Sequence, residues 1–309
     1  MGQENSKNTT GHVWDGDLQE LTNPLPRWWL WTFYITIVFS VVYWVMYPAW
    51  PIGKTFTKGV PGVNSVQYTA KTVDGKEVQK ETHWNTRAYL MADMNVAAAA
   101  QKQWFDKVAA TPFDQIAQDA DLMQFVQSAG KTLFADNCAA CHMAGGQGKI
   151  GLAPNLVDDS WMYGGTHDKI HETISAGRNG VMPAFSGVLK EDEITQVAHY
   201  ALSLSGEVHD AAAATAGEAI FKGAGGCVVC HGADAKGNPA LGSANLTDKI
   251  WLWADVGAAG SMEAKVAAVR SIIAEGMSRG KMPAQGQRLG ADQIKLLTVY
   301  VHDSLGGGN

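Results

Sequence analysis

The 309-residue sequence predicts a mainly α-helical protein in which one membrane-spanning helix near the N-terminus is followed by two similar small domains. Three observations predict this arrangement. An uncharged apolar run covers residues 28–47, a five-residue motif of two cysteines and a histidine occurs twice, and the segments around the two motifs repeat each other. All four cysteines fall within the two motifs, so none remains for a separate disulfide.

The apolar run is long enough to cross a bilayer as a helix. Twenty uncharged residues at about 1.5 Å per residue span about 30 Å, the thickness of the hydrocarbon core. A cleavable signal peptide is the competing interpretation, but residues 48–51 (Pro-Ala-Trp-Pro) offer no small-residue cleavage site. We therefore expect an uncleaved transmembrane helix at residues 28–48. Aromatic residues crowd its two ends, as they do at membrane interfaces: Trp28, Trp29, Trp31, Tyr43, Trp44, Tyr47 and Trp50.

Thr32, Thr36 and Ser40 recur every four residues, so they share one face of this helix. Small hydroxyl side chains permit close helix approach in lipid and can donate across to a neighbouring helix. That interpretation would dock the anchor on another membrane subunit. The alternative is that the hydroxyls donate to carbonyls of their own helix. The sequence leaves both interpretations open.

The repeated motif is Cys-Ala-Ala-Cys-His at residues 138–142 and Cys-Val-Val-Cys-His at residues 227–231. Cys-x-x-Cys-His is the attachment signal for haem c, in which each thiol adds to one vinyl group and the histidine ligates the iron. A thiol redox pair or half of a zinc site is the alternative for a lone Cys-x-x-Cys. Two complete motifs favour two covalently bound haem c groups. The predicted attachment residues are Cys138, Cys141, Cys227 and Cys230.

Each iron then needs a second axial ligand besides its histidine, His142 or His231. A thioether opposite histidine raises the reduction potential and suits electron transfer. Met182 and Met282 are the predicted ligands, because each precedes proline in a glycine-bearing loop at the same place in both repeats. The simpler expectation is that each domain's methionine binds its own haem, although a crossed pairing remains open. Methionines without a counterpart in the other repeat are not expected to be ligands: Met162, Met262 and Met277.

The ring of an axial histidine is fixed when its other nitrogen bonds to a carbonyl. Pro154 is well placed for this in the first repeat. Ala244 stands at the same place in the second repeat, where its carbonyl can serve equally in a less rigid loop.

The repeat extends beyond the motifs. Residues 155–161 match residues 245–251, each with Asn-Leu followed by a tryptophan at equal spacing. Near the end of each repeat, apolar residues suit one face of a terminal helix: Ile194, Val197 and Leu204 in the first, and Ile294, Leu297 and Val301 in the second. The linker at residues 206–216 is short, so the two domains are expected to sit close together.

The other segments carry fewer signals. Residues 88–110 are alanine-rich and predict a helix, and residues 60–81 are Gly- and Thr-rich with a turn at Asp74-Gly75. A net charge of −6 gives no nucleic-acid footprint. His167 and His171 share a helical face, but without a third ligand they are weak evidence for a metal site. No nucleophile triad, phosphate loop or paired carboxylates stand out.

The N-terminal stretch is distinctive. It reads Trp-Asp-Gly at residues 14–16, Asn-Pro-Leu-Pro-Arg-Trp-Trp at residues 23–29 and Tyr-Pro-Ala-Trp-Pro at residues 47–51. Together with the two haem motifs, this pattern resembles the dihaem cytochrome c subunit (subunit III) of cbb3-type cytochrome c oxidases, over nearly the whole chain. The resemblance implies two tandem class I cytochrome c domains and an electron-transfer subunit that is not itself catalytic.

The resemblance also implies partners and a location. Electrons would pass from a cytochrome c donor through this subunit to a monohaem cytochrome c subunit, and then to a haem–copper catalytic subunit that reduces oxygen and pumps protons. Haem c is attached outside the bacterial cytoplasm, so the haem domains would be periplasmic on the inner membrane, with the N-terminus cytoplasmic. Two alternatives are a free-standing membrane-anchored dihaem cytochrome c and a dihaem peroxidase. The two matched Met-Pro loops argue against the peroxidase, which needs an open iron site.

The expected organisation therefore has five parts. They are a cytoplasmic arm at 1–27, the transmembrane helix at 28–48, a periplasmic connecting region at 49–124, the first cytochrome c domain at 125–206 and the second at 212–309.

Overall fold

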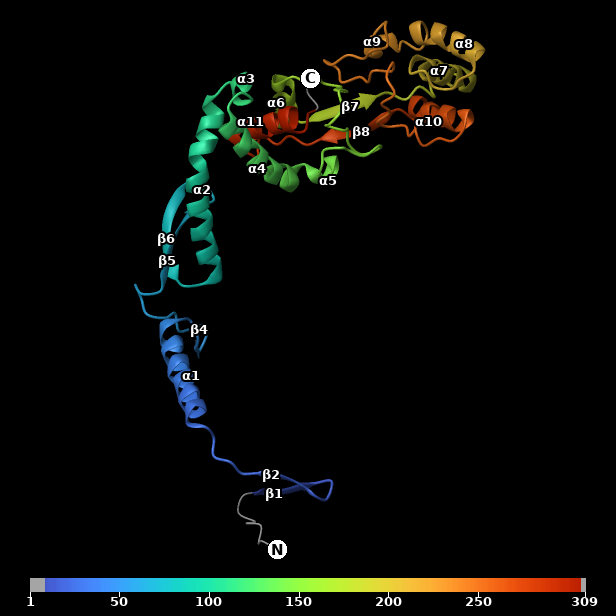
Figure 1. The fold of residues 1–309 in the computed structure, drawn as a ribbon. Helices are drawn as coiled ribbons and strands as arrows, with labels where there is room; N and C mark the ends of the chain where they lie inside the picture. Colours follow the sequence, from blue (N-terminus) through green and yellow to red (C-terminus); the bar gives the residue numbers. More distant parts are fainter. Residues whose placement is uncertain (1–8, 307–309) are drawn as a thin grey trace. The chain divides into compact units, whose positions relative to one another are not determined.

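The computed structural model describes residues 9–306, and their regular structure is mainly helical (Figure 1). The first eight residues of the predicted N-terminal arm lie outside the described residues. The chain divides into two compact units at residue 100. The first unit carries the apolar helix, and the second carries both haem motifs.

The first unit contains three antiparallel two-stranded sheets and two helices, the second of which continues past residue 100. Its elements are β1 (Thr9–Trp14), β2 (Leu18–Leu21), α1 (Arg27–Met46), β3 (Pro51–Ile52), β4 (Thr55–Phe56), β5 (Ser65–Lys71), β6 (Glu77–His83) and α2 (Thr86–Ala110).

The helix α1 is the candidate membrane span. It begins directly after Pro26 and ends before Tyr47, whose backbone is extended. Within residues 9–306 it is the one helix long and apolar enough to cross a membrane, and none of its side chains is buried. Its bounds agree with the predicted span to within two residues.

The three hydroxyl side chains of α1 are satisfied within the helix. Thr32 donates to the carbonyl of Trp28 at 2.9 Å, and Ser40 donates to the carbonyl of Thr36 at 2.8 Å. Thr36 itself donates to the carbonyl of Phe33 at 2.7 Å. These bonds match the alternative interpretation, in which the hydroxyls donate to carbonyls of their own helix. A role of this face in packing against another helix stays a prediction.

The strands β5 and β6 form a hairpin that the sequence did not predict. Their alternating residues, rich in β-branched and polar side chains, pair in register from Ser65–His83 to Lys71–Glu77. The predicted turn at Asp74-Gly75 lies at the tip of this hairpin, where the Gly75 amide donates to the carbonyl of Thr72 at 2.9 Å. The helix predicted at residues 88–110 is confirmed as α2.

The second unit consists of short helices and one pair of strands. Its elements after α2 are α3 (Phe113–Ile116), α4 (Ala120–Asn137), α5 (Ala139–His142), α6 (His167–Ala176), β7 (Arg178–Met182), α7 (Glu191–Leu204), α8 (Ala211–Lys222), α9 (Val228–His231), α10 (Met262–Glu275), β8 (Met277–Met282), α11 (Ala291–Val299) and the π-helical turn η1 (Tyr300–Ser304).

Polar side chains begin four of these helices by accepting hydrogen bonds from the free amides of the first turn. These N-cap residues are Asp119, Thr166, Asp210 and Ser261, for α4, α6, α8 and α10. Gly177 and Gly276 end α6 and α10 with φ angles of 71° and 72°, a conformation that favours glycine. The two halves of the repeat therefore share the same helix ends.

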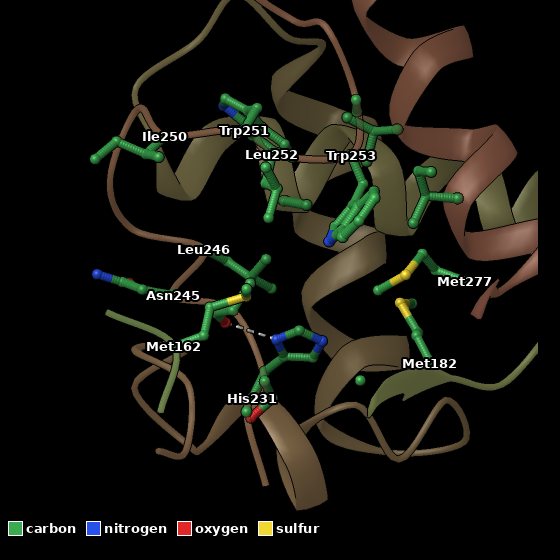
Figure 2. A pocket seen from close by; sticks show the side chains of 18 of the residues that line it. Met162, Met182, His231, Asn245, Leu246, Ile250, Trp251, Leu252, Trp253 and Met277 are labelled. Carbon is green, nitrogen blue, oxygen red and sulfur yellow. Dashed lines mark hydrogen bonds between the residues drawn. The ribbon is translucent and has the colours of Figure 1, made fainter. Parts of the chain in front are cut away.

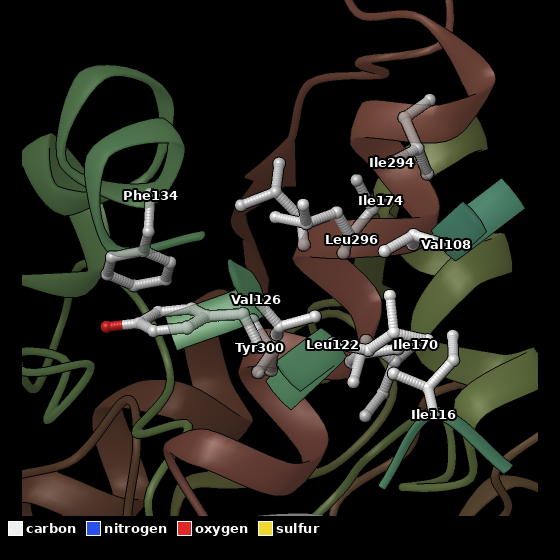
Figure 3. Packing of buried hydrophobic residues seen from close by; sticks show 13 residues of the cluster. Val108, Ile116, Leu122, Val126, Phe134, Ile170, Ile174, Ile294, Leu296 and Tyr300 are labelled. Carbon is white, nitrogen blue, oxygen red and sulfur yellow. The ribbon is translucent and has the colours of Figure 1, made fainter. Parts of the chain in front are cut away.

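Buried apolar residues form two clusters, and each cluster draws on both halves of the repeat. The first cluster combines α4 and α6 with α11 and η1 from the end of the chain, and Figure 3 shows Phe134 of α4 beside Tyr300 of η1. The second cluster combines α7 with α8 and α10. The predicted helix faces are confirmed. Ile194 and Val197 are buried in the second cluster and Leu204 is partly buried against it, while Ile294, Leu297 and Val301 are buried in the first.

The terminal helix of each repeat thus packs with the motif-bearing part of the other repeat, an arrangement that we call the exchange. The strands β7 and β8 pair antiparallel where the two segments cross (Figure 1). Just beyond them, the backbone N–H of Phe185 donates to the carbonyl of Ile273 in α10. The backbone N–H of Gln285 donates to the carbonyl of Ile174 in α6, and both distances are 3.0 Å. Each Met-Pro loop is therefore held by the helix of the other repeat.

Candidate haem-binding sites

Each Cys-x-x-Cys-His motif forms one helical turn, as the spacing predicts. The amide of His142 donates to the carbonyl of Cys138 at 2.9 Å, and the amide of His231 donates to that of Cys227 at the same distance. These bonds close the turns α5 and α9. Both cysteines and the histidine of a motif are then presented from one short segment.

The histidine rings are oriented by backbone carbonyls. Nδ1 of His142 lies 3.0 Å from the carbonyl oxygen of Pro154, and Nδ1 of His231 lies 2.9 Å from that of Ala244. Both predicted carbonyl partners are confirmed, including the alanine of the second repeat. With Nδ1 donating to a carbonyl, Nε2 of each ring is left as the metal-binding nitrogen.

Burial keeps the first of these imidazoles neutral. His142 is 8% exposed, and burial lowers its pKa below the ordinary histidine value, although the hydrogen bond to Pro154 opposes part of this change. Neutral imidazole is the form that ligates a metal. The surroundings of His142 therefore favour iron ligation over a charged surface role.

A cavity of about 590 Å³ opens beside His231, which is the size of a pocket for a large organic ligand. Cys227, Cys230 and Met182 also line it (Figure 2). In Figure 2 the side chains of Met182 and Met277 lie together on one side of the imidazole, while Met162 lies on the other side, beside Leu246. Its walls combine residues from both halves of the repeat.

A second, narrower pocket of about 90 Å³ lies beside His142. Cys138, Met282, Phe134 and Trp161 line it, and its surface is almost wholly apolar. The same residue types therefore surround both histidines. A porphyrin in this pocket, which belongs to the first repeat and is called the first pocket below, would require the lining side chains to move apart.

The pockets pair the histidines and methionines across the repeats. Met282 of the second repeat lies with His142 of the first, and Met182 of the first lies with His231 of the second. The simpler expectation, in which each methionine faces the histidine of its own repeat, does not match this geometry. The physical reason is the exchange, because each Met-Pro loop is bonded to the helix that precedes the other loop.

Two glycines hold the methionine backbones close to these helices. A Cβ atom on Gly276 would lie 2.6 Å from the carbonyl oxygen of Met182, and one on Gly177 would lie 2.5 Å from that of Met282. Real Cβ atoms do not approach a backbone oxygen so closely. The glycine that ends α6 or α10 is therefore required for the methionine of the other repeat to reach its pocket.

Two tryptophans provide a further test of whether the residues fit haem. Nε1 of Trp161 and Nε1 of Trp251 are buried and have no hydrogen-bond partner within residues 9–306. A buried N–H without an acceptor costs free energy, so native proteins rarely retain one. Each indole lines one of the two pockets, and a haem carboxylate would supply the missing acceptor. Sequence matching placed the two tryptophans in register but did not indicate this role.

The first cysteine of each motif fits thioether formation better than thiolate chemistry. Burial raises the pKa of the Cys138 thiol to about 11, with a smaller contribution from Cys141, and burial also raises the pKa of Cys227. Zinc binding and thiol exchange both use the thiolate, which these surroundings disfavour. All four cysteines are free of disulfides. A thioether to haem is neutral and suits the same surroundings.

His167 has different neighbours from those that its sequence spacing indicated. Its Nε2 lies 2.8 Å from a carboxylate oxygen of Asp303, and His302 bonds the other oxygen at 3.0 Å. These three residues could offer ligand atoms to a metal, a grouping that does not include His171 and that the sequence spacing did not indicate. The two imidazoles stack with centroids 3.7 Å apart and would have to separate to share an ion.

Comparisons with known proteins agree over nearly the whole chain. Residues 6–54 match the family described as the N-terminal domain of cytochrome oxidase-cbb3, FixP, and residues 126–200 and 212–301 match cytochrome c oxidase, cbb3-type, subunit III. The chain is 42% identical to the cbb3-type cytochrome c oxidase subunit FixP of Azorhizobium caulinodans, over 97% of this chain and 93% of that protein.

Two further relatives show the same coverage. The subunit FixP of Bradyrhizobium diazoefficiens is 43% identical, over 98% of this chain and 96% of the relative. The subunit CcoP of Cereibacter sphaeroides is 38% identical, over 97% and 95%. With its paired Cys-x-x-Cys-His turns and its apolar N-terminal helix, the chain belongs to the subunit III family of cbb3-type cytochrome c oxidases.

Proposed function

We propose that this chain is the membrane-anchored dihaem subunit that delivers electrons to a cbb3-type oxidase, with one haem c in each pocket. The observation that carries the proposal is that both pockets hold the same set of groups. Each is lined by a cysteine of its attachment turn, a histidine fixed through Nδ1, the Met-Pro methionine of the other repeat, and a buried indole N–H without a partner in residues 9–306.

In this proposal the haem ligands are paired across the repeats. Cys138 and Cys141 hold the first haem, whose iron is ligated by His142 and Met282. Cys227 and Cys230 hold the second, whose iron is ligated by His231 and Met182. Each haem, when bound, supplies an iron that accepts and releases one electron. The two cores correspond to two class I cytochrome c domains that share their terminal helices.

The residues of the chain act by holding these groups still. The carbonyls of Pro154 and Ala244 fix the imidazoles, and Gly177 and Gly276 fix the methionine backbones against the helix ends. The almost wholly apolar walls beside His142 exclude water there, which limits the reorganisation that accompanies a change of charge. Thioether ligation raises the reduction potential. A site in which the chain supplies both a histidine and a methionine to the iron would suit electron transfer and would leave no position for a substrate.

The anchor and the family define the proposed setting. The helix α1 would cross the bacterial inner membrane once, with the N-terminus cytoplasmic and the haem-bearing unit periplasmic. Residues 49–124 would form the periplasmic connecting region. The partners would be a cytochrome c donor, the monohaem cytochrome c subunit and the haem–copper subunit that reduces oxygen. The named relatives, all oxidase subunits that match over nearly their full length, support this setting.

The test is to isolate the full chain from membranes in a mild detergent and to measure covalent haem and co-purifying subunits. We expect two haem c groups per chain, together with haem b and copper from the partner subunits. Changing Cys138 or Cys227 to alanine should leave one covalent haem each. An unchanged haem content in both variants would contradict the attachment sites.

The same preparation separates the alternatives. Migration of the intact chain alone, with two haems and no haem b or copper, would support a free-standing dihaem cytochrome. Peroxide turnover by the isolated subunit would support a peroxidase. The matched methionine in each pocket argues against the peroxidase, because that reaction needs an open iron position.

A further inference from the structure

The pocket beside His231 contains a second methionine next to the proposed ligand. Met277 of β8 lies directly opposite Met182 of β7 in the strand register, and both side chains line the cavity. Side chains of directly opposed residues extend from the same face of a strand pair, with Cβ atoms about 5 Å apart. Figure 2 shows the two thioethers side by side, on the same side of the imidazole.

Both side chains have the reach to occupy one position. Methionine is unbranched and has three rotatable side-chain bonds, so its sulfur adapts to irregular space. Met277 is partly buried and lies in a cavity of about 590 Å³, where its sulfur is not locked by tight packing. Because the two Cβ atoms are about 5 Å apart, rotation of these side-chain bonds can bring either sulfur to the same iron.

The pocket beside His142 is also lined by a second methionine, Met162, but that residue does not lie on the paired strand opposite Met282. The residue opposite Met282 is Arg178, and its guanidinium is engaged elsewhere. Its Nε donates to Thr173 at 2.9 Å, one of its amino groups donates to Glu172 at 2.9 Å, and the group lies over the ring of Tyr163. The two sites are therefore equivalent in their ligands but differ at the position beside the methionine.

We propose that Met277 is a reserve axial ligand of the second haem, able to bind the iron when Met182 does not. This inference rests on the proposed function, since it requires haem at Cys227 and Cys230. This change of ligand breaks the bond between the iron and the sulfur of Met182 and forms one to the sulfur of Met277, with no change in electrons or protons. It keeps the second iron six-coordinate and closed to small external ligands.

The experiment compares alanine variants of the haem-loaded full-length chain in detergent. The first readout is the weak red absorption band that a thioether gives to ferric haem c, and the second is the binding of added imidazole. We expect Met182→Ala to retain nearly the full band and to bind little imidazole. Met282→Ala should lose about half of the band and bind one imidazole, because only one of two thioether-ligated irons is affected.

The double variant and two controls make the test specific. Met182→Ala with Met277→Ala should lose about half of the band and bind one imidazole, whereas Met277→Ala alone should match the wild type. Adding Met162→Leu to Met182→Ala should change nothing further, because Met162 lies on the other side of the imidazole.

The inference is overturned if Met182→Ala alone loses as much of the band as Met282→Ala does. It is also overturned if the remaining band depends on Met162 rather than on Met277. These outcomes differ from failure of the proposed function, in which the wild-type chain itself carries fewer than two covalent haems or shows no thioether band.

Discussion

Gly180 of β7 lies directly opposite Gly280 of β8, at the point where the two halves of the chain exchange their C-terminal segments. A Cβ atom on Gly280 would lie 3.0 Å from the ring of Trp253, and one on Gly180 would lie 3.3 Å from the hydroxyl of Tyr163. Small residues therefore let the two strands run between aromatic side chains. Beyond this crossing, each strand leads its methionine into the pocket of the other repeat.

The crossed pairing predicts which haem responds to each ligand change. Met282→His should lower the reduction potential of the haem held by Cys138 and Cys141, since imidazole replaces a thioether. The change should be tens to a few hundred millivolts, within the range of about 0.8 V over which axial ligands act. Redox titration in a Cys227→Ala, Cys230→Ala background, which keeps only the first haem, measures it. Met182→His in that background should leave the potential unchanged, and a shift there instead would restore the simpler pairing.

The exchange can also be tested far from the ligands. Leu202 of α7 and Leu297 of α11 are both fully buried, in the second and first clusters respectively. Changing either to alanine should cost about 2–5 kcal/mol of unfolding free energy, because of lost burial and the cavity left behind. In Leu202→Ala the second haem should lose its native histidine and methionine ligands at a lower denaturant concentration. In Leu297→Ala the first haem should do so.

Guanidinium unfolding followed through the haem absorption of single-haem variants measures these effects. The exposed Val188→Ala serves as the control and should be nearly neutral. Should Leu202→Ala weaken only the first haem site, the helices would not be exchanged.

The close approach of Gly276 to Met182 predicts a strong effect of one added methyl group. Gly276→Ala places alanine at a φ of 72°, which costs about 1–2 kcal/mol, and drives its Cβ into the backbone of Met182 and Ala184. We expect the thioether band of the second haem to weaken or shift. Gly206→Ala is the matched control, because its φ of 73° is nearly the same and no atom lies within 4 Å of a Cβ built there. Equal spectra for the two variants would contradict the role of Gly276.

The unpartnered indoles predict a polar contact with the bound haem. Trp161→Phe should reduce the stability of the loaded first site by about 1.5–3 kcal/mol, the usual contribution of a hydrogen bond to a charged group. Trp251→Phe should do the same for the second site. Chemical unfolding of single-haem chains, followed by haem absorption, measures each loss. If both variants are neutral, the indole N–H groups are not donors to the haem carboxylates.

One ion pair predicts a dependence of stability on pH. Lys265 of α10 donates to Glu207, just after α7, at 2.5 Å, and this contact lowers the pKa of the Glu207 carboxyl. The contribution of this ion pair to the free energy of unfolding is fully present above the ordinary pKa of glutamate. It is lost as the pH falls through the lowered pKa of the folded state. The difference in unfolding free energy between wild type and Glu207→Gln should therefore shrink on acidification. A difference that stays constant from neutral to acid pH would argue against this linkage.

The sequence predicted the local features of the fold well, because they depend on short spacing. The turns at the two motifs and the helix faces at Ile194 and Ile294 follow from residues a few positions apart, and the carbonyls of Pro154 and Ala244 lie only 12 and 13 residues from their histidines. The anchor helix followed from an apolar run bounded by proline. The hairpin of β5 and β6 escaped prediction because its strands mix polar and β-branched residues without a clear apolar face.

The exchange could not be predicted, for a physical reason. Met182 and Met282 occupy equivalent places in the two repeats, so each fits either pocket by local chemistry alone. What decides between the pockets is the crossing of β7 and β8, together with backbone bonds such as Phe185 to Ile273, which carry no side-chain signal. Met277 was set aside for lacking a counterpart in the other repeat. That asymmetry, with Arg178 opposite Met282 and Met277 opposite Met182, is what distinguishes the two sites.

The position of α11 at the end of the chain has a consequence for biogenesis. The first pocket receives Met282 and its covering helix from residues that are synthesised long after its cysteines. The turn at residues 138–142 therefore stays uncovered by α11 until that helix has been synthesised, an interval in which the proposed haem could be joined before the site closes. A premature stop just before α11 would spoil the site nearest the N-terminus and spare the one nearest the stop.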